Sequence, residues 1–344
     1  MAHNVMKRIA VKELYPPEDC QDWNAIVWWI NDAFTSDKDM LREPAIHSRL
    51  ARAGSSAIVG YRGSNFYEDQ FLLRIYMDFC AHGDLLNLLF QHAGKDEYEQ
   101  NRYRDDGRLD YLPVPNRALW MFFKDLSDAA CIMEAGSLSN ETPTDGWRTI
   151  VHRDIKPNNI FLGSSGSEGR GGIPFLKLGD FGLAVPEDWE ARHNPRGMNE
   201  AGTWGWKAPE QCRYDDENIP VYKLTSATNI WAIGRVMLKL LELTTPKPAV
   251  IKYNNADGGK VFPEPLNEEL MQDWDQDLAR LLQACLSPQP DDRITADQLN
   301  QAINLHIRRY FSEKDDNGEV SISRILKEGE ELRYRPDMQI AWAS

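Results

Sequence analysis

A few carboxylate, amide and lysine side chains in this chain stand at spacings that could do chemistry. Asp154 is followed by Lys156 two residues later and by Asn159 five residues later, and a second acidic motif, Asp180–Gly182, lies further along. Such a set places a proton acceptor, a cation and a metal ligand around one transferring phosphate. A solvated turn would explain a single run of this kind, but not three motifs in this order, the third being Ala208–Glu210. We therefore predict phosphoryl transfer.

The composition limits the class of protein and its partners. The chain has 344 residues with 42% hydrophobic content, which predicts a globular protein with two unequal lobes. Its 53 acidic and 39 basic side chains give a net charge of -14. Phosphate binding needs positive charge, so we expect no nucleic-acid partner and no anionic membrane surface. A basic peptide is the easier partner.

The cysteines indicate the compartment. Five of them are scattered along the chain without a Cys-x-x-Cys pair. This spacing favours reduced thiols over a disulfide framework or a zinc site, and hence an intracellular protein, cytoplasmic or nuclear.

No segment predicts a membrane span. The most apolar stretch, Ile230–Leu243, is too short and carries Arg235, Lys239 and Glu242. It is apolar nearly all round, which predicts a helix buried in the large lobe.

Taken together, these motifs resemble the eukaryotic protein kinase superfamily, from about Arg8 to about Leu299. Within it, the chain is most similar to serine/threonine protein kinases. The resemblance implies an α+β fold of two lobes, the small one mainly β and the large one mainly α. It divides the chain into a truncated small lobe with the hinge (residues 1–80), a large catalytic lobe (81–306) and a charged C-terminal tail (307–344).

The resemblance also implies a nucleotide pocket between the lobes. In that family a lysine on the third strand holds the ATP phosphates and pairs with a helical glutamate, while a gatekeeper and the hinge backbone meet the adenine. The residues at the matching positions are Ala10, Lys12, Glu43, Met77, Asp78, Cys80 and Asp180.

The large lobe is expected to hold the catalytic residues. Asp154 would orient the acceptor hydroxyl and take its proton, and Lys156 would steady the γ-phosphate of ATP. Asn159 and Asp180 would supply the oxygen ligands that Mg²⁺ prefers. Lys156, and Thr203 as a hydrogen-bond partner of Asp154 and Lys156, match kinases that act on Ser or Thr.

Two expectations concern support and regulation. The resemblance implies a structural ion pair between Glu210 and Arg293. It also implies that Arg153 seeks an anion in the activation segment, yet 183–202 contains no Ser, Thr or Tyr. We expect no phosphorylation switch in that segment, with Glu187 or Glu200 either as the resident anion or as an ordinary solvated acid.

Several features depart from the family pattern. None of the eleven residues before Lys12 is Gly, so a glycine-rich phosphate loop is missing there; either the chain is N-terminally incomplete or it binds ATP weakly. Pro44 follows Glu43 directly, which predicts a helix that starts near Pro44 or is kinked, and a less secure Lys12–Glu43 pair. Asn229 stands where the family usually has Asp, which predicts weaker support of the catalytic loop.

Two inserted segments complete the expectations. Apolar spacing from Trp23 to Phe34 predicts an extra amphipathic helix, whose tryptophans fill a core or dock a partner. The segment 163–172, almost all Gly, Ser and charge, predicts a mobile loop.

The sequence therefore predicts a protein serine/threonine kinase that uses ATP and Mg²⁺ on a protein substrate. The alternative is a pseudokinase that has kept the fold as a binding or allosteric scaffold.

Overall fold

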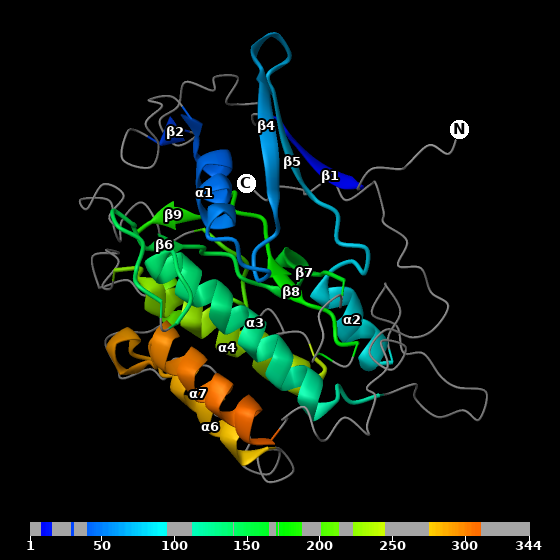
Figure 1. The fold of residues 1–344 in the computed structure, drawn as a ribbon, viewed down its shortest axis with the longest axis vertical. Helices are drawn as coiled ribbons and strands as arrows, with labels where there is room; N and C mark the ends of the chain where they lie inside the picture. The colour runs from blue at the N-terminus through cyan, green and yellow to red at the C-terminus, as the bar shows by residue number, and fades with distance from the viewer. Residues whose placement is uncertain are drawn as a thin grey trace, which may run out of the picture.

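The computed structural model describes residues 8–15, 29–30, 40–94, 112–139, 141–164, 170, 172–187, 201–212, 223–244 and 275–310. These residues form two lobes, with the small lobe uppermost in Figure 1. Among the described helices, none is both long and apolar enough to cross a membrane.

The small lobe contains a three-stranded antiparallel sheet. Its order is β1 (Ile9–Leu14), β5 (Leu72–Asp78), β4 (Tyr61–Tyr67). Along β1, exposed and half-buried residues alternate, as the period of two of a strand requires. Lys12 therefore lies on the same half-buried face of the strand as Ala10 and Leu14.

Helix α1 (Arg42–Arg52) packs beside strand β4 of this sheet and, in Figure 1, lies above β6 and β9 of the large lobe. The helix begins two residues before Pro44, so this proline occupies the first turn. The first N–H groups of a helix have no partner within it, so proline removes no bond there. The expected start near Pro44 is confirmed.

The predicted helix from Trp23 to Phe34 is wrong where the structure describes it. Trp29–Ile30 form strand β2, which pairs with β3 (Met40–Leu41) in the register Trp29 to Leu41 and Ile30 to Met40. Aromatic and β-branched residues suit a strand as well as a helix, and the partner strand directly before α1 decides between them. The rest of that segment lies outside the described residues.

The large lobe is built on two long helices. These are α3 (Asn116–Ala135) and α4 (Ser226–Glu242), the second matching the predicted buried helix. The helices α2 (Leu85–His92), α6 (Gln276–Cys285) and α7 (Ala296–Tyr310) surround them. Two short pairs, β6 (Ile150–Val151) with β9 (Val185–Pro186) and β7 (Ile160–Leu162) with β8 (Leu176–Leu178), carry the loops between the lobes.

Two segments expected to be irregular contain ordered residues. Helix α7 continues to Tyr310, past the predicted start of the tail at 307, because Ile307 packs against the main core. The segment 163–172 is anchored where it is described: the buried Arg170 donates two hydrogen bonds to Asp125 of α3, at 3.0 and 2.7 Å. A loop rich in glycine can still be fixed by one arginine that finds a buried carboxylate.

Candidate active site

Asp154 sits in the loop between β6 and the short 3-10 helix η3 (Pro157–Asn159), and hydrogen bonds fix both of its carboxylate oxygens. Oδ1 accepts from the Thr203 N–H at 3.0 Å and from the Thr203 hydroxyl at 2.7 Å. Oδ2 lies 3.0 Å from Lys156 Nζ and accepts from Asn159 Nδ2 at 3.2 Å. The carboxylate is thus held in one orientation by three residues.

Thr203 connects the two halves of this site. Its hydroxyl donates to Asp154 and accepts from Lys156 Nζ at 2.7 Å, so the expected hydrogen bonds are present. Gly202 makes the approach possible, since it has a φ of +108° and a side chain there would collide with the Arg153 carbonyl.

The Asn159 amide is oriented by the loop. Its Nδ2 donates to the Asp154 carbonyl at 2.9 Å and to the Asp154 carboxylate, which leaves Oδ1 as the oxygen that could ligate a metal. The Asn159 carbonyl accepts from Gly179 N–H at 2.9 Å, one residue before Asp180. This bond joins the loops that carry the two predicted metal ligands.

Lys12 bridges two acids from different parts of the chain. Its Nζ lies 2.7 Å from Glu43 Oε1 on α1 and 2.7 Å from Asp180 Oδ1 after β8. The Lys12–Glu43 pair is therefore formed despite Pro44. Burial alone would lower the pKa of Lys12, but Glu43 and Asp180 raise it above its ordinary value. Burial likewise raises the pKa of Asp180, and Lys12 outweighs it, so that carboxyl stays below its usual range.

Strained backbone marks the same region. Arg153 and Asp180 have φ values of +68° and +59°, a conformation that non-glycine residues seldom adopt. Gly182 supplies the room beside them, because a Cβ there would approach Glu43 Oε2 to 3.1 Å.

The residues of the predicted nucleotide pocket meet at the end of β5. Ala10 pairs with Met77 across the β1–β5 register, and Met77 packs against the small-lobe core. The Asp78 N–H donates to the Gly60 carbonyl at 2.8 Å, and the Cys80 carbonyl accepts from Gly83 N–H at 3.3 Å.

Asn229 supports the catalytic loop in its own way. Its Oδ1 accepts from the His152 N–H at 2.9 Å, and its Nδ2 donates to the Ile150 carbonyl at 2.8 Å. The side chain is buried and satisfies one donor and one acceptor of the backbone. Asn229 therefore pairs with the Ile150 carbonyl, which an ionised Asp could not do because it has no hydrogen-bond donor.

The expected Glu210–Arg293 pair is present. Arg293 Nη1 and Nη2 lie 2.6 and 2.7 Å from the two Glu210 oxygens, and both side chains are fully buried. This bidentate pair fastens the end of the activation segment to the base of the large lobe.

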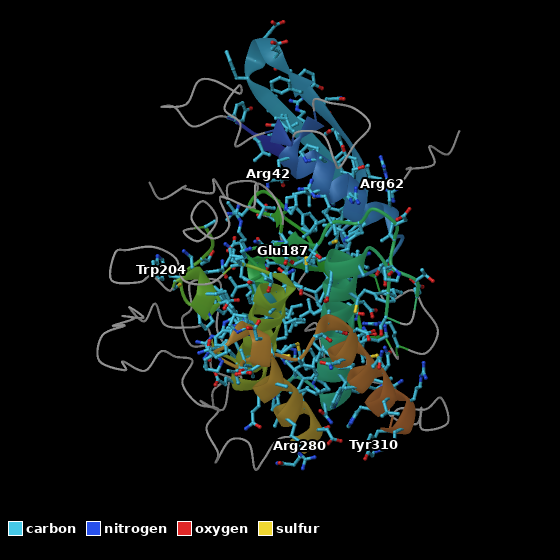
Figure 2. The ribbon with its side chains drawn as sticks, turned by 90° about the vertical axis from the view of Figure 1, so that its left-hand side faces the viewer. Arg42, Arg62, Glu187, Trp204, Arg280 and Tyr310 are labelled. Carbon is cyan, nitrogen blue, oxygen red and sulfur yellow. The ribbon has the colours of Figure 1, made fainter. Side chains whose placement is uncertain are left out.

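Two arginines converge on the backbone after Asp180. Arg153 Nε donates to the Leu183 carbonyl at 2.6 Å and Arg42 Nη2 to the Gly182 carbonyl at 3.1 Å. Burial, together with the neighbouring Arg42, lowers the pKa of Arg153 to about 9. Figure 2 shows Arg42 at the junction of the lobes. Two acids were predicted as the anion that Arg153 contacts. Glu187 directly follows β9, and its N–H donates to the Thr149 carbonyl. Glu200 lies outside the described residues.

Arg42 was not singled out by sequence, and neither was His47, four residues after Glu43. A histidine or arginine on an amphipathic helix carries no motif. Only the spacing of His47 from Glu43, which puts both on one face, could have suggested its place.

The fold and this site define a class of protein. Residues 147–303 match the protein kinase domain, and the chain has the protein kinase fold with a small antiparallel sheet and a helical large lobe. The chain carries a protein kinase domain and is a distant homologue of serine/threonine kinases.

The relatives are fungal and animal kinases. The chain is 26% identical to the G2-specific protein kinase nim-1 of Neurospora crassa over 86% of its length, and 26% identical to the G2-specific protein kinase nimA of Emericella nidulans over 91%. It is 27% identical to the serine/threonine-protein kinase Nek9 of Xenopus laevis over 86%. It spans 31%, 41% and 26% of the lengths of these three proteins, less than half in each.

Proposed function

We propose that this chain is a serine/threonine protein kinase that transfers the γ-phosphoryl group of ATP to hydroxyls of a protein substrate. One observation carries the proposal. The Asp154 carboxylate is held by Thr203, Lys156 and Asn159, while Lys12 joins Glu43 to Asp180 on the other side of the same loops.

Asp154 is the proton acceptor in this proposal. Its carboxylate orients the acceptor hydroxyl and takes the hydroxyl proton as the oxygen attacks the γ-phosphorus and the bond to the β-phosphate oxygen breaks. The hydrogen bonds of Thr203 keep Oδ1 in place for this step. Lys156, 2.7 Å from the Thr203 hydroxyl, lies where it can steady the transferred group's negative charge.

Lys12 is the phosphate-binding cation in this proposal. Its ammonium group is charged, and Glu43 fixes it from helix α1. Because Asp180 shares that ammonium, nucleotide phosphates can exchange places with Asp180 as the partner of Lys12, which frees Asp180 for metal binding.

The donor set fits magnesium. The described residues contain no cluster of three or more His, Cys, Asp or Glu that would hold a metal by protein ligands alone. Asp180 and the Asn159 amide oxygen are hard oxygen ligands from two joined loops, a number that suits an ion completed by phosphate and water. When bound, Mg²⁺ neutralises charge on the phosphates.

Two features bear on the residue that is phosphorylated and on the charge of the protein substrate. Lys156 and Thr203 accord with Ser or Thr as acceptor, and a chain of net charge -14 favours a basic protein substrate.

A scaffold without catalysis is the second candidate. It is favoured by Asn229, which stands where the resembled family usually has Asp. Nucleotide binding without turnover would identify it.

The test is Mg²⁺-dependent phosphorylation of a basic protein by the whole chain and by Asp154→Asn. Loss of the proton acceptor is expected to lower turnover by roughly 100-fold or more. The matched control is Asp291→Asn, the same change at an exposed acid far from the loop, which should leave turnover unchanged. Equal background in all three proteins would contradict the kinase proposal.

A further inference from the structure

Three arginines from the two lobes gather where helix α1 ends. Arg49 and Arg52 lie in the last turn of α1, three residues apart and so on the same side of the helix. Arg148 belongs to the large lobe, in the segment between α3 and β6. Arg49 reaches this segment, because its Nη2 donates to the Gly146 carbonyl at 2.6 Å. We call the three residues Arg49, Arg52 and Arg148 the arginine patch.

The surface that supports Arg49 is fixed by hydrogen bonds and packing. The central carbon of its guanidinium group lies 4.7 Å from the centre of the Trp147 ring. The Trp147 Nε1–H donates to the Met133 carbonyl of α3 at 3.1 Å, and the ring packs against Gly136, where any side chain would collide with it. Arg49 is therefore held in place by a carbonyl and an aromatic face.

The three positive charges of the patch repel one another. Burial lowers the pKa of Arg49 below its ordinary value, and the neighbouring charges of Arg148 and Arg52 lower it further. The helix dipole stabilises cations at the end of α1, but Arg148 comes from another element and only adds a like charge. Asp145, the acid nearest to Arg148 along the chain, is exposed. In a chain of net charge -14, this concentration of positive charge suits an anionic partner.

A phosphate ester matches the patch better than a carboxylate does. A phosphorylated Ser or Thr carries a charge of about -1.5 to -2 at pH 7 and three acceptor oxygens. Guanidinium groups bind phosphate oxygens through paired N–H donors, and clusters of arginines recognise phosphorylated segments in this way. An anionic membrane attracts larger clusters, of about 4–8 Lys or Arg, and the net charge of the chain opposes it.

We propose that the arginine patch is a docking site for a phosphorylated serine or threonine in a segment of a partner protein. The site goes beyond the proposed kinase activity and does not depend on it, because none of its residues belongs to the active site. A partner bound there contacts α1 of the small lobe and the segment before β6 of the large lobe together.

The experiment is fluorescence anisotropy of a labelled short peptide that carries one phosphoserine. It is titrated with the whole chain at physiological ionic strength, beside the same peptide with unmodified serine. We expect the phosphopeptide to bind at least about tenfold more tightly, because one charge-assisted hydrogen bond already changes affinity by about this factor.

Two variants locate the binding site. Arg52→Gln and Arg148→Gln should each weaken phosphopeptide binding by about tenfold. Arg52 is exposed, so its substitution should leave the fold intact, and Arg52→Lys should restore only part of the affinity, because lysine keeps the charge without the planar pair of donors. The control is Arg308→Gln, the same change at an exposed arginine in the last turn of α7, which should bind the phosphopeptide like the wild type.

Three results would overturn the proposal. The first is that the wild type fails to bind the phosphopeptide or binds both peptides equally, and the second is that neither Arg52→Gln nor Arg148→Gln weakens binding. The third is an equal loss in Arg308→Gln, which would show only a general attraction between charges.

Binding and turnover separate this proposal from the kinase proposal. If the wild type binds the phosphopeptide as expected but shows no ATP turnover, the docking site stands and the kinase proposal fails. If turnover depends on Asp154 but the phosphopeptide does not bind, the reverse holds.

Discussion

A single amide decides how the catalytic loop is attached to the large lobe. Asn229 offers an acceptor to the His152 N–H and a donor to the Ile150 carbonyl, both buried at 2.9 and 2.8 Å. A carboxylate at this position would place a second oxygen against the Ile150 carbonyl. The family pattern predicts that Asn229 supports the catalytic loop less strongly than Asp would. In this backbone arrangement, however, the Ile150 carbonyl needs a donor, which Asn supplies and ionised Asp does not.

Asn229→Asp, the change toward the usual family residue, should therefore destabilise this chain. We expect the free energy of unfolding to fall by about 1–3 kcal/mol, the cost of leaving a buried carbonyl unpaired. Urea denaturation measures it, with Asn65→Asp on an exposed position of β4 as the matched control. A variant as stable as the wild type would mean that the loop can rearrange around a carboxylate.

At the scale of elements, helix α1 carries a buried titrating group, His47, whose Nε2–H donates to the Val59 carbonyl at 2.7 Å. The pKa of His47 is lowered by burial from 6.5 to about 4, with Lys12 lowering it further and Asp180 and the bond to Val59 opposing. As the pH falls, His47 therefore becomes protonated near pH 6.5 in the unfolded chain but only near pH 4 in the folded chain. The stability that this neutral histidine provides is complete above pH 6.5 and is lost as the pH falls toward 4.

Between pH 7 and pH 5 this group alone should reduce the free energy of unfolding by about 2 kcal/mol. Other groups titrate in the same range, so the relevant quantity is the difference between wild type and His47→Gln at each pH. Chemical denaturation at several pH values measures it. A difference that is constant from pH 7 to pH 5 would show that His47 does not titrate differently on folding.

The elements also show what the sequence could and could not predict. The loop with Asp154, Lys156 and Asn159 was predictable, because a contiguous motif fixes both spacing and order. The contact of Lys12 with Asp180 could be expected only through the family resemblance, since 168 residues separate them. Strand β2 was missed because a few apolar residues fit two periodicities, and the partner strand that selects one is not visible in local sequence. The anchoring of Arg170 and the hydrogen bond of His47 to Val59 depend on tertiary partners in the same way.

At the scale of the whole molecule, one ion pair holds together three distant parts of the large lobe. Arg293 pairs with Glu210 after the activation segment and also donates to the carbonyls of Ala227 at the start of α4 and Ser287 after α6, at 2.9 and 2.8 Å. The Thr228 hydroxyl donates to Glu210 Oε1 at 2.9 Å. Because no part of either side chain is exposed, the pair is a fixed point for the segments that meet there.

Arg293→Met should be the most damaging of these changes, because it leaves the Glu210 carboxylate buried without its counterion. We expect a loss of about 3–5 kcal/mol in the free energy of unfolding, and a smaller loss in the double variant Glu210→Gln/Arg293→Met, which removes both charges. Arg280→Met is the control: Arg280 is 74% exposed in its pair with Asp277, and an exposed pair contributes about 1 kcal/mol at most. If Arg293→Met costs no more than Arg280→Met, the buried pair does not fasten the activation segment.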